Sequence, residues 1–220
     1  MNDMKKGLIF VLFALVSIVS YSQISWNAKV GMNMSNLTGL EENSMKVGFN
    51  VGVGMEYQFT EMWSIQPSLM FSTKGTKQDF SEDGYKDEYT YNPMYLELPI
   101  MAAARFAIAD NQNIVVKAGP YLAYGIGGKV KNSWSDGDES GEDKYDIFKD
   151  VKDEDGDIVN EAAKKFDFGI GVGVAYEINK FFVDLTGSFG LTKLSDGINA
   201  KGEKTSVKNM NFSIGVGYKF

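Results

Sequence analysis

The sequence contains neither cysteine nor histidine among its 220 residues. Without cysteine the chain forms no disulfide and carries no lipid-modified cysteine anchor. Without histidine it lacks Ser-His-Asp and Cys-His catalytic groups and the usual ligands of a zinc site. Only carboxylate, lysine or tyrosine chemistry remains, and no paired constellation of such residues stands out. We therefore expect no catalytic residues, no metal site and no cofactor.

Long apolar runs are also scarce. The one such run, Leu8–Val19, follows two lysines and precedes Ser20-Tyr21-Ser22, which has the small-x-small pattern of a cleavage site. It is too short to span a bilayer comfortably and has the layout of a cleaved signal peptide. We expect residues 1–22 to be removed and residues 23–220 to form one exported domain. A retained N-terminal membrane anchor is the alternative, although no stop-transfer pattern follows the run.

Basic residues are outnumbered, with 22 lysines and arginines against 29 acidic residues and a net charge of -7. This balance argues against nucleic acid as a partner. The hydropathy pattern points elsewhere, because apolar and polar residues alternate with period two, which is typical of strands with one apolar face. The alternation recurs in eight runs, which cover residues 25–35, 46–59, 63–74, 96–106, 114–130, 166–178, 181–191 and 210–220.

The connections between these runs alternate in length. Short turns are expected at 60–61, 108–113 and 179–180, and long polar loops at 36–45, 75–92, 132–165 and 193–206. Short turns on one rim and long loops on the other are typical of transmembrane barrels with both termini in the periplasm. The sequence therefore predicts an all-β fold, an eight-stranded antiparallel up-and-down transmembrane β-barrel with long outer loops and short periplasmic turns.

Alternation alone does not say whether the apolar face points into lipid or into the core of a soluble ligand-binding barrel. Many glycines and formal charges lie on the polar face, which suits a narrow, crowded lumen. The chain also ends in an aromatic residue, Phe220. We therefore expect the apolar face to contact outer-membrane lipid. Pro67, Pro99 and Pro120 lie inside predicted strands, where we expect bulges and a slip of register.

Aromatic residues cluster at the ends of the runs that meet the short turns. Such residues form girdles at membrane interfaces. The candidates for the periplasmic interface are Trp26, Tyr57, Phe59, Trp63, Phe106, Tyr176, Phe181, Tyr218 and Phe220.

Charges of both signs fall on the predicted inward face near the same end. They are Lys29, Glu56, Arg105, Lys117, Glu177, Asp184 and Lys219. An eight-stranded barrel has an interior that side chains fill, and ions in it must pair or keep water. We predict a salt-bridged plug with Arg105, the single arginine, as bidentate donor. A selectivity filter in an open channel is the alternative interpretation.

Three segments resemble the PorT-like outer-membrane β-barrel family, often labelled porins. They are Ser64–Gly75, Tyr95–Ile100 and Gly119–Gly125. The resemblance spans most of the chain from Ser25 onward and implies an outer-membrane location. For some members it also implies a part in protein secretion. It identifies no catalytic residue, and the label porin does not itself show a pore.

Two motifs have simpler explanations than ligand binding. The glycines of Gly169–Gly173 fit one face of a strand better than a nucleotide loop. The acidic loop Asp150–Asp157 lacks the spacing of an EF-hand and is predicted to be solvated. Three functions remain open: a platform for envelope or surface interactions, passive diffusion of small solutes, and an accessory role in secretion.

Overall fold

The computed structural model describes residues 23–40, 43–82, 85–136, 139–153, 155–198 and 204–220. The predicted signal peptide, residues 1–22, lies outside the described residues. In the described ranges the regular secondary structure consists of β-strands alone. No helix in that part of the chain is long and apolar enough to cross a membrane.

The strands are given in chain order. They are β1 (Ile24–Thr38), β2 (Asn43–Gln58), β3 (Trp63–Thr73), β4 (Thr76–Glu82), β5 (Tyr85–Ala109), β6 (Gln112–Asp136), β7 (Glu139–Asp146), β8 (Val151–Lys152), β9 (Ile158–Asn160), β10 (Phe166–Ile178), β11 (Phe181–Gly190), β12 (Ser195–Ile198) and β13 (Lys204–Lys219).

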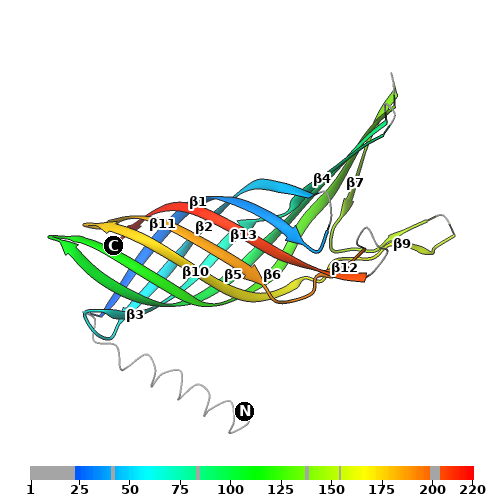
Figure 1. Cartoon of the computed structure of the whole chain (residues 1–220). Coiled ribbons are helices and arrows are strands. Elements are labelled where there is room, and N and C mark those ends of the chain that lie inside the picture. The colour runs from blue at the N-terminus through cyan, green and yellow to red at the C-terminus, as the bar shows by residue number, and fades with distance from the viewer. Residues whose placement is uncertain (1–22, 41–42, 83–84, 137–138, 154, 199–203) are drawn as a thin grey trace, which may run out of the picture.

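Eight of these strands form a closed antiparallel ring in the order β1, β2, β3, β5, β6, β10, β11, β13. The ring closes where β13 pairs with β1, from Asn27 opposite Lys219 to Thr38 opposite Lys208. Figure 1 shows the resulting cylinder. Consecutive barrel strands are neighbours, which confirms the predicted up-and-down barrel of eight strands.

The short turns and the C-terminus share one end of the cylinder (Figure 1). Two of the turns place an asparagine at positive φ, Asn111 at 56° and Asn179 at 53°. Asparagine tolerates this conformation better than most residues, which suits a two-residue connection between strands. The last residue is also fixed there, because the Phe220 N–H donates to the Trp26 carbonyl at 2.9 Å.

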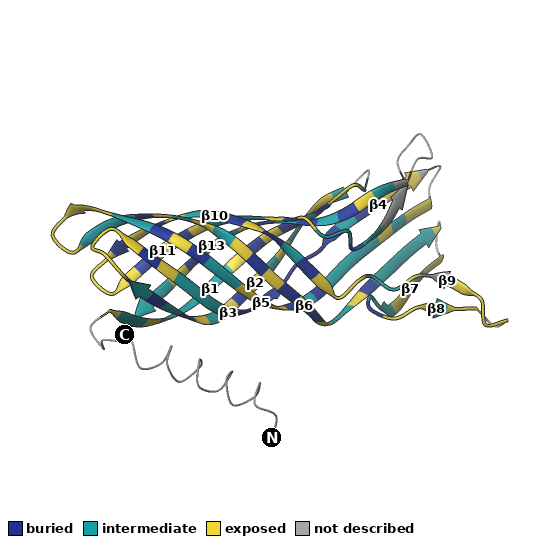
Figure 2. Ribbon diagram, turned by 90° about the horizontal axis from the view of Figure 1, so that it is seen from below, coloured by how far each residue is buried: buried dark blue, intermediate teal, exposed yellow. Residues whose placement is uncertain are grey.

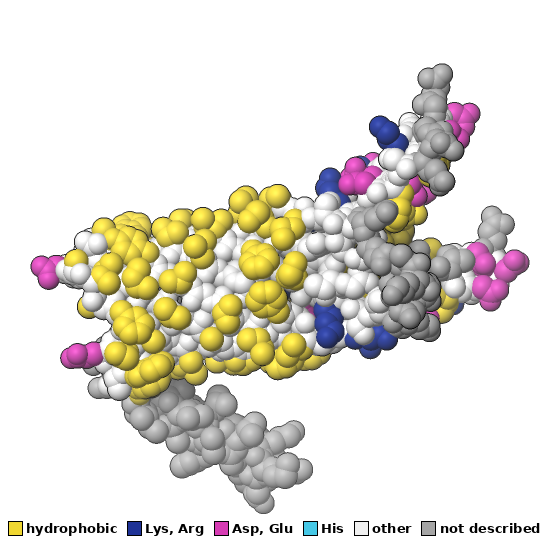
Figure 3. All heavy atoms as spheres, in the orientation of Figure 1, with side chains coloured by type: hydrophobic (Ala, Val, Ile, Leu, Met, Phe, Trp, Pro, Cys, Tyr) yellow, Lys and Arg dark blue, Asp and Glu magenta, His cyan; other side chains and the backbone are white. Residues whose placement is uncertain are grey.

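The apolar face of every barrel strand points outward. Val47 on β2 is 64% exposed and Val216 on β13 is 54% exposed, whereas Asn33 and Asp184 inside the barrel are 0% exposed. Figure 2 shows the alternation of exposed and buried residues along the strands, and Figure 3 shows the hydrophobic side chains covering the cylinder. The predicted facing is confirmed, and a soluble barrel with an apolar interior is inconsistent with this arrangement.

Small residues on the inner face allow the narrow barrel to close. A Cβ atom at Gly52 would overlap the Leu69 carbonyl oxygen, and one at Gly119 would overlap the Ile100 carbonyl oxygen. Backbone atoms cannot move aside as a side chain can. Glycine is therefore required at these two positions by close approach of the neighbouring strand.

The bulges expected at the three strand prolines are absent. Pro67 lies opposite Ile100, Pro99 opposite Tyr121 and Pro120 opposite Ile170, and the register is the same on both sides of each proline. Each of these strands has a second neighbour, and in the ladder with that neighbour two consecutive residue pairs, including the one at the proline, are missing. The lost N–H donor thus interrupts one ladder locally without shifting the strand. The register of β5 against β6 shifts instead at two other places, between Met94 and Tyr95 and between Ala107 and Ala109.

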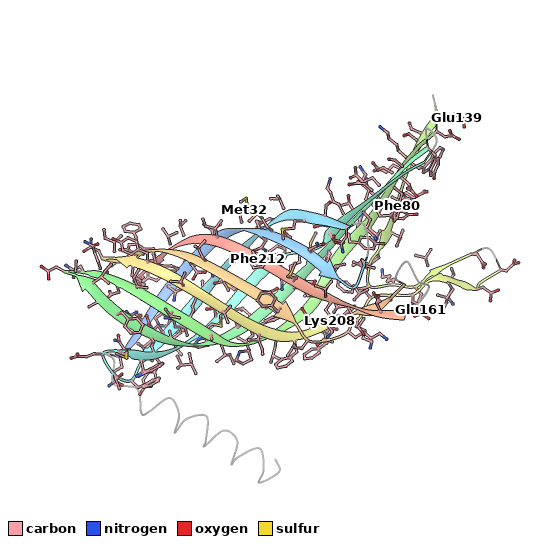
Figure 4. The ribbon with its side chains drawn as sticks, viewed as in Figure 1. Met32, Phe80, Glu139, Glu161, Lys208 and Phe212 are labelled. Atoms are coloured by element: carbon pink, nitrogen blue, oxygen red, sulfur yellow. The ribbon has the colours of Figure 1, made fainter. Side chains whose placement is uncertain are left out.

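The outer connections are shorter than predicted because several of the strands continue beyond the barrel. Residues 76–82, 85–92, 129–136 and 139–146 pair in sequence as four antiparallel strands, here called the projecting sheet. It extends away from the cylinder at the β4 and β7 labels of Figure 1, and Figure 4 labels Phe80 and Glu139 on it. Thr76, Gln78 and Val130 at the base of this sheet are buried, whereas its other side chains that the structure describes are exposed or half-buried. Because no face of the sheet is buried along its whole length, the sequence lacks the alternation that marks a half-buried strand.

Candidate functional site

Four strands bring charged side chains together at the end of the lumen near the short turns, here called the inner end. The Arg105 guanidinium on β5 donates to both oxygens of Glu56 on β2, at 2.9 and 3.0 Å, and to Glu177 on β10, at 3.1 Å. The Lys219 ammonium on β13 lies 2.8 Å from Glu56 and 2.5 Å from Glu177. Ser64 adds a hydrogen bond to Glu56 at 2.7 Å. Two cations and two carboxylates therefore form a closed set, the inner cluster.

A second group lies next to it. Lys29 is 2.8 Å from one oxygen of Asp184, and Lys117 pairs with the other oxygen. The Thr186 hydroxyl donates to Asp184 at 3.0 Å. These three charges form the middle cluster. All seven charged residues predicted for the lumen thus belong to the inner or the middle cluster. Arg105 contacts two carboxylates.

A third group, closer to the outer end, was not among the predicted site residues. Lys74 is only 1% exposed and lies 2.6 Å from Glu97 and 4.8 Å from the centre of the Tyr121 ring. Asp167 accepts hydrogen bonds from the Tyr121 hydroxyl at 3.0 Å and the Asn209 amide at 2.8 Å. The sequence could have indicated this outer cluster. In the period-two pattern, Lys74, Glu97 and Asp167 each fall at a position whose side chain points into the lumen.

The three clusters balance in charge. Five cations, Lys29, Lys74, Arg105, Lys117 and Lys219, accompany five carboxylates, Glu56, Glu97, Asp167, Glu177 and Asp184. Amides and hydroxyls fill the space between them: Asn33 donates to Ser72 at 2.9 Å and accepts from Asn50 at 2.6 Å. Two cavities in this region measure 70 and 40 Å³. Each holds a few water molecules at most.

Chain segments outside the strands cover the outer mouth. The Phe148 ring, 8% exposed, packs edge-on against Tyr95 at a centroid distance of 6.1 Å. A side chain at Gly125 would overlap this ring, so the glycine makes room for Phe148. The covering segment is hydrogen bonded to the barrel, because Gly125 N–H donates to the Lys165 carbonyl at 2.7 Å and Ile147 N–H to Gly128 at 3.3 Å. We call the covering segment, residues 147–153 and 155–165, the outer cap.

The nine aromatic residues predicted for the periplasmic interface lie near the short turns and the chain end. Seven of them are more than a third exposed, and Tyr57 and Tyr218 are half-buried. Tyr218 makes edge contacts with Phe181 at 5.0 Å and with Phe220 at 5.6 Å. Further outward aromatics that were not predicted pair nearer the other rim, such as Phe189 with Phe212 at 5.9 Å. Figure 4 labels Phe212 and another lipid-facing residue, Met32.

The acidic loop after β7 is solvated as predicted, since Asp150, Asp153, Asp155 and Asp157 are exposed, and it also contains a short strand pair. Val151 pairs with Asn160 to form a short hairpin. Asp150 accepts a hydrogen bond from the Ala162 N–H at 2.8 Å, and Asp153 accepts one from the Asp157 N–H at 2.9 Å. Among the described residues, no three acidic side chains gather closely enough to hold a metal ion.

Comparison with known proteins identifies the family. A family model described as "Outer membrane protein beta-barrel domain" matches residues 17–196, well over half of the chain. The chain belongs to this family. It is therefore an outer-membrane β-barrel protein, as the outward apolar band and the closed ring also indicate. No curated protein matches the sequence.

Several solved structures resemble this chain along most of its length. Ail, the attachment invasion locus protein of Yersinia pestis, is 15% identical with a TM-score of 0.41, covering 89% of this chain and 98% of its own. Neisserial surface protein A is 11% identical with a TM-score of 0.42, covering 90% and 97%. OprG from Pseudomonas aeruginosa is 9% identical with a TM-score of 0.45, covering 89% and 95%.

Proposed function

We propose that this protein is a non-enzymatic barrel with a closed lumen that holds the projecting sheet outside the membrane as a platform for interactions at the cell surface. The observation that carries the proposal is the length of β5 and β6, which have 25 residues each. At about 3.3 Å per residue each strand runs roughly 80 Å. A tilted strand needs only about 9–11 residues to cross the hydrocarbon core, so more than half of each strand is available outside it.

The contents of the lumen support the non-conducting part of the proposal. Paired charges occupy the lumen at three levels, and the outer cap covers the mouth beyond them. An eight-stranded barrel has an interior about wide enough for side chains alone. In the proposal the lumen stabilises the barrel, and recognition belongs to the projecting sheet.

The surface of the projecting sheet is suited to water and to polar partners. Lys77 pairs with Glu88 at 3.2 Å, and Glu142 pairs with Lys131 at 2.6 Å and also with Lys144. Hydrogen bonds from Lys131 and Lys144 lower the pKa of Glu142, so its carboxylate stays ionised at neutral pH. Charged side chains along an edge strand such as β7 also discourage uncontrolled strand pairing.

Two further expectations belong to the same proposal. Residues 1–22 act as a signal peptide that is removed on export, since their charge and hydropathy have that layout. Within the barrel family, the PorT-like resemblance suggests that the envelope partner is a secretion component. Solute diffusion through the lumen is the competing function, and the experiment below distinguishes it.

The test is a trimmed barrel in which Asp79–Glu88 and Asn132–Asp143 are each replaced by an Asn-Gly turn. The flanking pairs Gln78 with Tyr89 and Lys131 with Lys144 remain to close the shortened hairpins. We expect the trimmed protein to keep its heat-modifiable band on a gel and to lose proteins cross-linked to the wild type in intact outer membranes. Identical cross-links in both proteins, or steady single-channel currents through the wild type in planar bilayers, would contradict the proposal.

A further inference from the structure

A pocket of 330 Å³ lies at the outer mouth of the barrel. Its walls come from β1, β5, β6, β7 and β13 and from segments 161–164 and 193–195. The volume is within the range of small-molecule sites, which start at about 300 Å³. It is several times larger than either cavity of the lumen, and it shares no lining residue with the cavity beside Tyr121.

Tyr95 separates this pocket from the lumen. It lines the pocket and is 1% exposed, while its ring lies 5.7 Å from the Lys74 ammonium of the outer cluster. The Phe148 ring packs against Tyr95 from the side of the outer cap. A molecule in the pocket therefore rests on a closed aromatic floor, and the arrangement suits retention at the surface rather than passage through the barrel.

The backbone around the pocket is held by hydrogen bonds between segments that are distant in sequence. Ala163 N–H donates to the Ile147 carbonyl, Lys164 N–H to Leu194, and Leu194 N–H to Val207, each at 2.9 Å. Fixed walls reduce the conformational cost of binding. These hydrogen bonds join the connection from β7 to β10, the connection from β11 to β13, and strand β13 itself. The pocket therefore does not depend on one exposed loop.

The lining combines an apolar wall with a charged rim. Leu37, Leu194 and Val207 are buried and pack as one hydrophobic cluster with Leu40. Leu40, Tyr91 and Ile147 line the pocket and are only half-buried, so they supply the apolar surface that a ligand can contact. Burial raises the pKa of Tyr91 to about 12, so its phenol stays neutral.

Three lysines and two carboxylates occupy the charged rim: Lys149, Lys164, Lys193, Asp146 and Glu161. Asp146 already accepts the Phe148 N–H at 3.0 Å and pairs with Lys149 at 3.4 Å. These five rim residues therefore carry one net positive charge. Lys149 and Lys164 are both exposed, and Lys149 already pairs with Asp146, which makes Lys164 the residue to substitute.

We propose that this pocket binds a small amphipathic carboxylate, with the hydrocarbon part against Leu40, Tyr91 and Ile147 and the carboxylate at the Lys164 side of the rim. Apolar burial supplies most of the affinity, and the positive rim selects the sign of the head group. Four lining residues, Tyr91, Val130, Tyr145 and Asp146, lie at the base of the projecting sheet, and all four remain in the trimmed barrel. Binding at this pocket can therefore be tested separately from the platform function.

The probes are 4-phenylbutyrate, 4-phenylbutylamine and 4-phenylbutanol, which share one apolar body and differ in charge. Their binding to the full barrel in lipid nanodiscs is measured by calorimetry, with empty nanodiscs subtracted. We expect saturable binding in the order carboxylate, alcohol, amine. Lys164→Glu should weaken carboxylate binding about tenfold and narrow or reverse the preference over the amine. The matched control Lys86→Glu, on the projecting sheet, should leave all three affinities unchanged.

A filling substitution tests the location. Ala162→Trp should abolish binding, and Ser195→Phe serves the same purpose if the first variant fails to show a heat-modifiable band. Both residues line the pocket. No saturable binding to the wild type, equal binding of the three probes, or carboxylate affinity that survives both filling substitutions would overturn the proposal.

Discussion

Replacing Arg105 with methionine isolates the contribution of the inner cluster. The methionine keeps an unbranched apolar stem, but the guanidinium that contacts Glu56 and Glu177 is lost. Lys219 then remains as the one cation contacting both carboxylates. One negative charge is left without compensation inside the barrel.

The expected cost follows from burial. The Glu56 and Glu177 side chains are 3% and 7% exposed, so water screens the remaining charge poorly. Removing one partner of a buried ion pair costs about 3–5 kcal/mol. The neighbouring 40 Å³ cavity, which both carboxylates line, can admit water and moves the expectation to the low end of that range. We expect Arg105→Met to lower the free energy of unfolding by about 3 kcal/mol.

Restoring charge balance should recover most of this loss. In the double variant Arg105→Met with Glu56→Gln, the pair Glu177–Lys219 remains and residue 56 keeps a partner in Ser64. We expect a net loss of only about 1 kcal/mol, which corresponds to ordinary hydrogen-bond differences. Lys86→Met on the projecting sheet is the control and should change stability by less than about 0.5 kcal/mol.

The assay is reversible urea unfolding in detergent micelles, followed by tryptophan fluorescence and analysed as a double-mutant cycle. If Arg105→Met unfolds at the wild-type urea concentration, or if the double variant loses the sum of both single losses, the inner cluster does not stabilise the barrel as argued. Planar-bilayer recording of the same variants shows whether Arg105 also blocks ions. Currents in the variant with none in the wild type would assign it that role.

Two further predictions concern the outer half. Lys74→Met leaves Glu97 without its 2.6 Å partner, and urea unfolding should show a loss of about 3 kcal/mol that Glu97→Gln partly reverses; an unchanged midpoint would contradict the pairing. Phe148→Ala removes the ring that packs on Tyr95 and should speed cleavage after nearby lysines by trypsin at least several-fold, while the barrel band on the gel persists. Cleavage at the wild-type rate would show that Phe148 does not hold the outer cap in place.

The barrel itself was predictable because lipid imposes a strict pattern. In residues 46–59 every second side chain is apolar, and one register error would place all of them in the lumen. The direction of the faces was also predictable, since glycine and charge do not suit a lipid-facing surface. Strand count and facing therefore follow from the sequence before any coordinates are known.

The projecting sheet and the behaviour at the prolines were not predictable by the same reasoning. Residues 76–82 carry polar side chains on both faces, so period two gives no signal even though the strand is well paired. Pro67, Pro99 and Pro120 each lack an N–H donor, yet whether a strand bulges or merely loses a local pair depends on its neighbours. Such outcomes depend on tertiary context.

For the lumen, the alternation along each strand predicts which side chains point inward. It does not predict which of these side chains contact each other. Lys29 on β1 and Lys117 on β6 each reach Asp184 on β11 across one intervening strand, β13 and β10 respectively. The missed residues Lys74 and Asp167 follow the same alternation, so extending it along the whole of each strand would have found them. Their partners depend on strand order and tilt, which one-dimensional alternation does not contain.

The same kinds of ion pair contribute differently in the two parts of this molecule. Lys131 and Glu142 on the projecting sheet are each about 40% exposed, and such surface pairs contribute about 0–1 kcal/mol. Arg105 and Glu56 in the lumen are 13% and 3% exposed, where loss of one partner costs several times more. Charge substitutions should therefore be tolerated on the sheet and damaging in the lumen. This difference leaves the sheet free to change its surface chemistry toward a partner while the barrel that carries it remains stable.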